Sequence, residues 1–208
     1  MIFRCIPVGI LQANCYVIGC PKTHEAAIID PGAEPELILS VIEKNQLKVV
    51  KIINTHGHPD HMGANGKIKE ATQAPILIHS ADKDMLTHPL PMPFDAEEPA
   101  ASPAPDILIK EGDIIKVGEL KLTVIETPGH SPGGICLKLN DILLTGDTLF
   151  AGTIGRTDLP GGSLEALNHS IRHKLLVLPD ETEVYPGHGP STTIHQEKHY
   201  NPFFSDYL

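Results

Sequence analysis

Apolar residues along the chain gather in many short runs, most of them followed closely by glycine or proline. Short apolar or alternating runs bounded by such turn residues are typical of β-strands. Strands are therefore predicted at 2–6, 15–18, 26–29, 49–53, 76–78, 107–109, 114–117, 120–125, 135–139, 142–144 and 183–185. The run at 49–53 is nearly continuous in apolar residues, so a buried strand is expected there.

Apolar residues at helical spacing interrupt the strands at a few places. Pro35 is suited to the first position of a helix, a second helix is expected near 64–73, and Ser163 is suited to cap a third. In the third helix one face is expected to carry Leu164, Leu167, Ile171 and Leu175. Strand-rich halves with a few helices predict an α+β or layered α/β fold, in which helices cover sheets.

The segment from 88 to 105 interrupts this pattern, since six of the 19 prolines lie there. Proline removes a backbone donor and disfavours both helices and central strands. We interpret the segment as a long solvated loop. A lid over a binding site is the alternative, because long loops in compact domains are often functional.

Length and composition describe an ordinary globular chain, with 208 residues, 41% hydrophobic residues and a mean hydropathy of −0.04. A single domain over residues 1–208 is expected, and a chain of this size needs no disulfides to fold. The four cysteines contain no Cys-x-x-Cys pair, which favours a reducing cytoplasm and buried, unpaired thiols.

A formal net charge of −10 argues against a nucleic-acid partner, because a phosphate backbone is held by clustered Lys and Arg. No run approaches the ~18 apolar residues of a membrane span. The N-terminus does not resemble a signal peptide, since polar residues and Pro7 interrupt it. We therefore expect a cytoplasmic protein with no nucleic-acid or membrane partner.

Histidine is the one residue type out of proportion, with 12 copies against four tyrosines and no tryptophan. Four potential metal ligands fall within six residues directly after the predicted strand at 49–53: His56, His58, Asp60 and His61. Three more follow other predicted strands at turns that contain glycine: His130, Asp147 and His188. Because strand ends converge at one edge of a sheet, these side chains are expected to meet.

Seven donors are too many for one tetrahedral ion and suit two. His56, His58 and His130 are assigned to the first metal. Asp60, His61 and His188 are assigned to the second, with Asp147 as the bridge. Zinc is the default for such imidazole and carboxylate ligands, with iron or manganese as alternatives. Two ions per chain with open coordination positions would share a water or hydroxide, the expected nucleophile.

The runs at 55–63, 128–131, 145–150 and 186–189 resemble the motifs of the metallo-β-lactamase superfamily, and most closely its glyoxalase II-like hydrolases, also called hydroxyacylglutathione hydrolases. The stretches at 154–162 and 201–203 resemble short bacterial members of that group. The resemblance implies an α+β fold of the four-layer αββα sandwich type, with the site on one edge, and it supports the ligand division above. Only 191–208 follow the last motif, so the helical region that helps to hold glutathione in full-length glyoxalase II is missing.

These observations predict a dinuclear metal-dependent hydrolase that acts on a small-molecule thioester, with Asp60 and Asp147 as its catalytic carboxylates. Asp60 is expected to serve both as a ligand and as a proton acceptor. Arg156 is placed to bind a substrate carboxylate. Pairing of Arg156 with Asp158 is an equally weighted alternative.

Three other functions stay open at this point. The first is a persulfide dioxygenase with one iron on His56, His130 and Asp147, since such enzymes also resemble the sequence. The second is a hydrolase of lactones or other esters. The third, a metal-binding module without turnover, is disfavoured because a structural site would be closed by four protein ligands.

Overall fold

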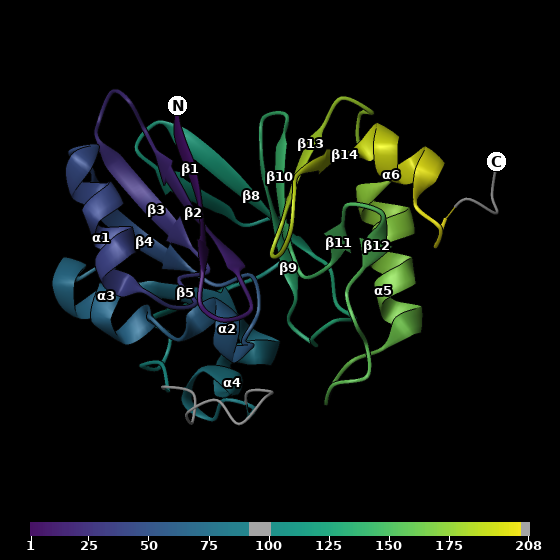
Figure 1. The fold of residues 1–208 in the computed structure, drawn as a ribbon, viewed down its shortest axis with the longest axis horizontal. Coiled ribbons are helices and arrows are strands. Elements are labelled where there is room, and N and C mark those ends of the chain that lie inside the picture. Colours follow the sequence, from purple (N-terminus) through teal and green to yellow (C-terminus); the bar gives the residue numbers. More distant parts are fainter. Residues whose placement is uncertain (92–100, 205–208) are drawn as a thin grey trace.

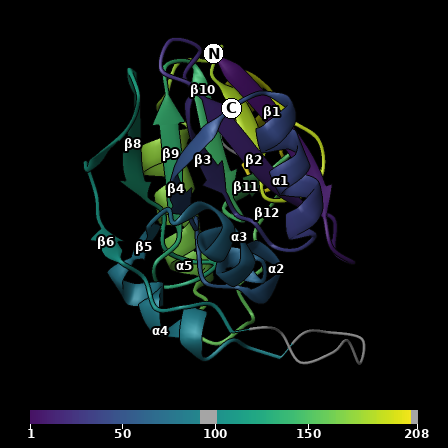
Figure 2. The ribbon, with the colours of Figure 1, turned by 90° about the vertical axis from the view of Figure 1, so that its left-hand side faces the viewer.

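The computed structural model describes residues 1–91 and 101–204. Two six-stranded sheets pack face to face, and helices cover the outer face of each (Figure 1). The view in Figure 2 shows α1 and α3 lying across the outer face of the first sheet. The architecture is therefore the four-layer αββα sandwich expected from the sequence.

The first sheet runs in chain order and ends with four parallel strands. Its strands are β1 (Ile2–Val8), β2 (Ala13–Gly19), β3 (Glu25–Ile29), β4 (Lys48–Ile53), β5 (Ile76–His79) and β6 (Ile107–Ile109). β1 to β3 pair antiparallel. The parallel strands place the chain segment after β4 at one edge of the sandwich.

The second sheet has the order β14-β13-β10-β9-β8-β7. Its strands are β7 (Ile114–Val117), β8 (Leu120–Glu126), β9 (Ile135–Leu139), β10 (Ile142–Gly146), β13 (Glu183–Pro186) and β14 (Thr192–Thr193). β10 and β13 are parallel, so the segments that follow them leave the sheet at the same edge. A two-stranded ribbon, β11 (Leu149–Phe150) and β12 (Thr153–Ile154), extends from β10.

The helices are short. They are α1 (Pro35–Lys44), α2 (Pro59–Met62), α3 (Asn65–Thr72), η1 (Ser80–Asp82), α4 (Lys83–Thr87), α5 (Leu164–Ser170), the π-helical turn η2 (Ile171–Leu175) and α6 (Ile194–Tyr200). Pro35 opens α1, and the Ser163 hydroxyl caps α5 by accepting the Ala166 amide, as predicted. No helix in the described part of the chain is both long and apolar enough to cross a membrane.

Three layers of apolar side chains hold the sandwich together. One lies between the first sheet and α1 and α3, a second between the two sheets, and a third between the second sheet and α5, η2 and α6. The layer between the sheets is built from both of them, for example by Ile29, Ile53 and Leu137, which are fully buried. Burial on this scale is the main term that fixes the positions of the strand ends.

The eleven predicted strands and the three predicted helices are all confirmed, whereas two details about single residues are wrong. The predicted helix near 64–73 is α3. Leu164 does not share the buried face of its helix but is 51% exposed, because it starts the first turn of α5 at the surface. Of the four cysteines, Cys5 is exposed. The middle of the proline-rich segment, residues 92–100, lies outside the described residues, so the solvated loop stays a prediction and the lid stays its alternative.

Candidate metal centre

Four chain segments meet at one edge of the sandwich, and each follows or joins strands. Residues 54–61 follow β4, His130 lies in the connection from β8 to β9, Asp147 follows β10, and His188 follows β13. The two sheets are linked at this edge, since Ala13 of β2 forms a bridge with His188 and the Asn14 amide donates to the Gly187 carbonyl. The sequence-predicted ligands are thus brought together from both sheets.

The first group consists of His56, His58 and His130, whose potential ligand atoms lie within 4.8 Å of one another. All three are buried, and Nδ1 of His58 lies 2.8 Å from Nε2 of His130. Nε2 of His56 is buried without a hydrogen-bond partner. Because buried polar atoms are rarely left unpaired, this orphaned nitrogen fits a metal ion.

The second group consists of Asp60, His61 and His188. Nε2 of His188 lies 3.2 Å from the Asp60 carboxylate and 3.3 Å from Nε2 of His61. His61 is completely buried, whereas the His188 and Asp60 side chains are partly exposed. The group therefore has one side open toward solvent, which leaves room for a further ligand.

Asp147 lies between the two groups. Its Oδ2 is 3.5 Å from Nε2 of His130 in the first group and 3.7 Å from Nε2 of His188 in the second. Its Oδ1 is 3.4 Å from Nε2 of His61 and has no hydrogen-bond partner. A carboxylate in this position can bridge two cations.

Backbone carbonyls orient two of the histidines. Nδ1 of His130 lies 2.8 Å from the Arg156 carbonyl, and Nδ1 of His188 lies 3.0 Å from the Leu11 carbonyl. A carbonyl oxygen only accepts, so each Nδ1 must carry the proton. The Nε2 lone pair of the neutral ring is then free, as is usual for metal-binding histidines.

Asp30, which the sequence analysis did not name, performs the same task for His61. Its buried carboxylate accepts the Thr55 amide at 2.7 Å and the Thr55 hydroxyl at 2.6 Å. Its Oδ2 also lies 3.1 Å from Nδ1 of His61, which directs Nε2 of that ring toward Asp147. Asp30 directly follows a buried strand, as the ligands do, but Pro31 and Gly32 come next, so the local sequence is also that of an ordinary turn.

Asp82 is a second missed carboxylate, and it holds the loops of the first group. It is fully buried in η1. It accepts the Gly57 amide at 3.1 Å, the Ser131 hydroxyl at 2.6 Å and the Gly133 amide at 2.6 Å. It thereby joins the loop of His56 and His58 to the loop of His130.

In the absence of metal, burial and the surrounding charges shift the pKa values of histidines in the two groups in opposite directions. Burial and neighbouring histidines lower the pKa of His58 to about 4 and take the pKa of His56 well below its usual value. Burial also opposes protonation of His61, but three nearby carboxylates outweigh it and raise the pKa of His61 to about 10. His56 and His58 are therefore ready to bind a cation at neutral pH, whereas His61 must first release a proton.

Arg156 lies at the rim of the site and is paired. Its guanidinium donates two hydrogen bonds of 2.7 Å to the Asp158 carboxylate. Both side chains are exposed, at 61% and 68%. Of the two roles predicted for Arg156, the structure thus shows the pair with Asp158, while the Arg156 carbonyl has the unpredicted role of orienting His130.

A cleft of about 570 Å³ opens over the metal-binding side chains. Apolar residues form much of its wall: Leu11, Pro59, Leu90, Pro91, Phe150 and Leu159. Leu90 and Pro91 belong to the predicted proline-rich loop, so the described start of that loop borders the site. A volume of this size suits a small organic ligand.

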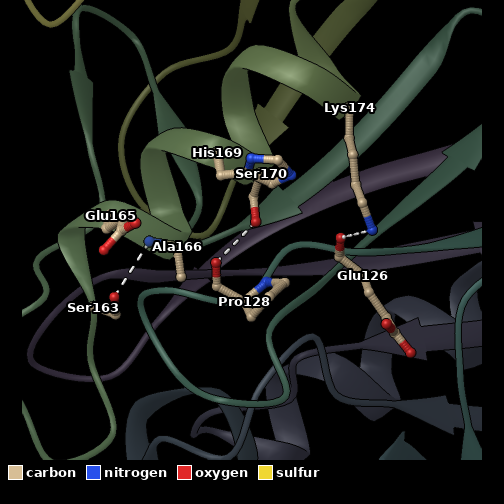
Figure 3. A pocket seen from close by; sticks show the side chains of 8 residues that line it. All are labelled: Glu126, Pro128, Ser163, Glu165, Ala166, His169, Ser170 and Lys174. Carbon is tan, nitrogen blue, oxygen red and sulfur yellow. Dashed lines mark hydrogen bonds between the residues drawn. The ribbon is translucent and has the colours of Figure 1, made fainter.

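Two other features lie away from this centre. A hollow of about 500 Å³ beside α5 is lined by groups of both charges, and Lys174 there donates to the Glu126 carbonyl (Figure 3). A further group of Asp180, His195 and His199 lies at the surface, where Asp180 also pairs with Lys198. Neither feature combines burial with unpaired donor atoms, so the cleft over the seven ligands is the candidate active site.

A family model described as the metallo-beta-lactamase superfamily matches residues 8–188. The chain therefore belongs to the metallo-beta-lactamase superfamily. It is 44% identical to an uncharacterized protein of Aquifex aeolicus, over 100% of this chain and 99% of that protein. It is also 38% identical to the hydroxyacylglutathione hydrolase GloC of Haemophilus influenzae, over 96% of each.

Two solved structures share the fold closely. The BLEG-1 B3 metallo-beta-lactamase superposes with a TM-score of 0.92 at 35% identity, covering 98% of this chain and all of that one. TTHA1623, solved in a di-iron-bound form, superposes with a TM-score of 0.85 at 34% identity, covering 96% of this chain and 99% of that one. The similarity extends over nearly the entire length of each protein.

Proposed function

We propose that the protein is a dinuclear metal-dependent hydrolase of small thioesters, of the hydroxyacylglutathione hydrolase type. The observation that carries the proposal is the pair of three-donor groups on either side of Asp147, in which Nε2 of His56 and Oδ1 of Asp147 are buried without a hydrogen-bond partner. The similarity to GloC supports the reaction class, and the di-iron form of TTHA1623 supports two metals per chain. Zinc is the expected metal, with iron or manganese as alternatives.

His56, His58 and His130 would hold the first ion, and Asp60, His61 and His188 the second. When bound, two divalent ions supply an activated water near neutral pH and polarise a substrate carbonyl. Asp147 keeps the two groups at a fixed separation. The carbonyls of Arg156 and Leu11 and the carboxylate of Asp30 fix the ring orientations, so no reorganisation of the ligands is needed during turnover.

Asp60 is better suited to bind a cation than to accept a proton from water, because a carboxylate with a lowered pKa is a weak base. Burial opposes its ionisation, but His61 and His188 outweigh this effect and hold the pKa of Asp60 below its usual range. The carboxylate is therefore ionised at neutral pH. A thiol leaving group has a pKa of about 8.5, so it departs as a thiolate without a dedicated general acid.

The direct test combines metal analysis with a thioester assay. We expect purified, loaded protein to contain two transition-metal ions per chain and to release free thiol from S-lactoylglutathione. A fully loaded sample with no more than one ion per chain would contradict the dinuclear site. Loaded protein that leaves all thioesters intact but opens a lactone or cleaves an ester would reassign the substrate.

An iron-dependent persulfide dioxygenase is the second candidate. His56, His130 and Asp147 form a two-histidine, one-carboxylate set that suits one iron with open positions. Their rings and carboxylate are adjacent, with 4.8 Å between the two ring centroids and 3.5 Å from His130 to Asp147. Oxygen uptake on addition of a persulfide to a one-iron sample would favour this candidate.

A further inference from the structure

The cleft offers apolar contacts to the part of a substrate that extends beyond the reacting carbonyl. Leu11, Leu90, Phe150 and Leu159 line it from four separate segments of the chain. Apart from the metal-binding side chains, Arg156 is the one charged group among the lining residues that the structure describes. The walls thus suit an uncharged, apolar arm.

No other lysine or arginine can supply positive charge from outside the described residues. The chain has 16 such residues, and none lies within 92–100 or 205–208. Segment 92–100 instead contains Asp95, Glu97 and Glu98. Among the lysines and arginines, Arg156 is thus the one that lines the described cleft.

Arg156 is already neutralised by Asp158. The two hydrogen bonds of 2.7 Å form a bidentate pair, in which both nitrogens on one side of the guanidinium are used. A substrate carboxylate that displaced Asp158 from Arg156 would replace one ion pair by another, with little gain in binding free energy. It would also leave the Asp158 charge unpaired beside it, which is repulsive.

We propose that the Arg156–Asp158 pair and the apolar cleft walls select thioesters with an uncharged, apolar arm and disfavour those whose arm carries carboxylates. Asp158 is then a specificity-determining residue, because it masks the one cation at the rim. This inference rests on the proposed thioester hydrolysis. Glutathione thioesters, whose carrier has two carboxylates, are therefore expected to be cleaved with a lower kcat/KM than a thioester of the same acyl group on an uncharged carrier.

The first experiment compares two thioesters of one acyl group, for example phenylacetyl, on N-acetylcysteamine and on glutathione. We expect a higher kcat/KM for the uncharged N-acetylcysteamine thioester. Asp158→Asn unmasks Arg156 and should shift the ratio of kcat/KM toward the glutathione thioester by about two- to fivefold, the range of exposed ion pairs. Glu119→Gln is the matched control, since it breaks the remote, exposed Lys22–Glu119 pair and removes the same charge.

The second experiment measures binding without turnover. S-benzyl thioethers of the same two thiols are titrated by calorimetry into metal-free and zinc-loaded protein. The uncharged thioether should bind more tightly in both states. Leu159→Ala should weaken it several-fold through lost apolar contact, whereas Leu37→Ala on the exposed face of α1 should not.

The outcomes separate this inference from the proposed function. Preference for the glutathione compounds, no binding of the uncharged thioether, or equal ratios in Asp158→Asn and Glu119→Gln would each overturn the inference. Tighter binding of the uncharged thioether by a loaded protein that cleaves no thioester would support the selectivity and refute thioester hydrolysis. Faster cleavage of the uncharged thioester with the expected shift in Asp158→Asn supports both.

Discussion

Replacement of Asp30 by asparagine tests whether a buried carboxylate outside the metal-binding set controls that set. In the parent, Asp30 accepts the Thr55 amide on one oxygen, while the other oxygen faces the Thr55 hydroxyl and Nδ1 of His61. Asparagine has one acceptor oxygen and an NH2 group of similar size. Whichever way the amide is turned, the NH2 group faces an N–H donor of Thr55 or of His61.

The magnitude follows from this mismatch. A buried donor left without an acceptor costs about 1–3 kcal/mol. The free energy of unfolding of metal-free Asp30→Asn should be lower than that of the parent by a similar amount. Loss of a partner that orients a metal-binding histidine typically lowers metal affinity by about 10–100-fold. The larger loss of affinity is expected at the second group, because His61 contacts Asp30 directly, whereas His56 of the first group contacts Asp30 only through the Thr55 hydroxyl.

Urea unfolding of the metal-free protein and zinc competition with a chromophoric chelator measure the two effects. Asp113→Asn is the control, since its carboxylate accepts a backbone amide in a turn far from the site. Unchanged zinc affinity in Asp30→Asn, with the stability loss present, would show that Asp30 supports the fold alone. If neither the free energy of unfolding nor the zinc affinity changes in Asp30→Asn, the supporting role of Asp30 is refuted.

Three further predictions concern the metal-binding set. Asp147→Ala should reduce the metal content from two ions toward one or none and remove nearly all turnover, because the bridge is lost. The circular dichroism spectrum should stay unchanged. Two retained ions with full activity would contradict this prediction. Gly187→Ala should have a similar effect on metal content, since an added methyl group would overlap Oδ1 of Asp147 and approach the His61 ring; normal loading would show that the loop can yield. Zinc binding to the second group should release protons at pH 7, because the pKa of His61 is raised to about 10 and that of His188 is also raised. Binding to the first group should release few, because the pKa of His58 is lowered to about 4. Calorimetry in buffers of different ionisation enthalpy counts these protons, and equal release at both groups would contradict the assignment. By the same linkage, protonated His61 stabilises the metal-free protein fully below its unfolded pKa of 6.5, and this contribution is lost as pH rises through about 10.

The sequence was informative about strands and about the side chains at their ends. Short apolar runs with turn residues identify strands because such runs pack between layers, and the structure confirms all eleven of them. The cluster at 56–61 stood out because four metal-ligand types rarely occur so close together. Distances between the two groups depend on the packing of two sheets, which no local pattern encodes.

The short helices and the supporting carboxylates were not predictable in the same way. α2 has four residues and α4 has five, too few for helical periodicity to appear. Asp30 is followed by Pro31 and Gly32, so its sequence context is that of a turn. In the structure Asp30 has a positive φ of 53°. Its contact with His61 requires knowledge of the tertiary structure, because the two residues are 31 positions apart.

The division of ligands between the sheets has a mechanical consequence. Each metal-binding group takes side chains from the segment after β4 of the first sheet and from segments of the second sheet. A bound ion therefore acts as a cross-link between the two halves of the sandwich. At a free metal concentration 100 times the dissociation constant, each site adds about 2.7 kcal/mol of folding free energy. The rigidity of the whole protein, and its resistance to proteolysis, should thus follow the metal supply of the cell.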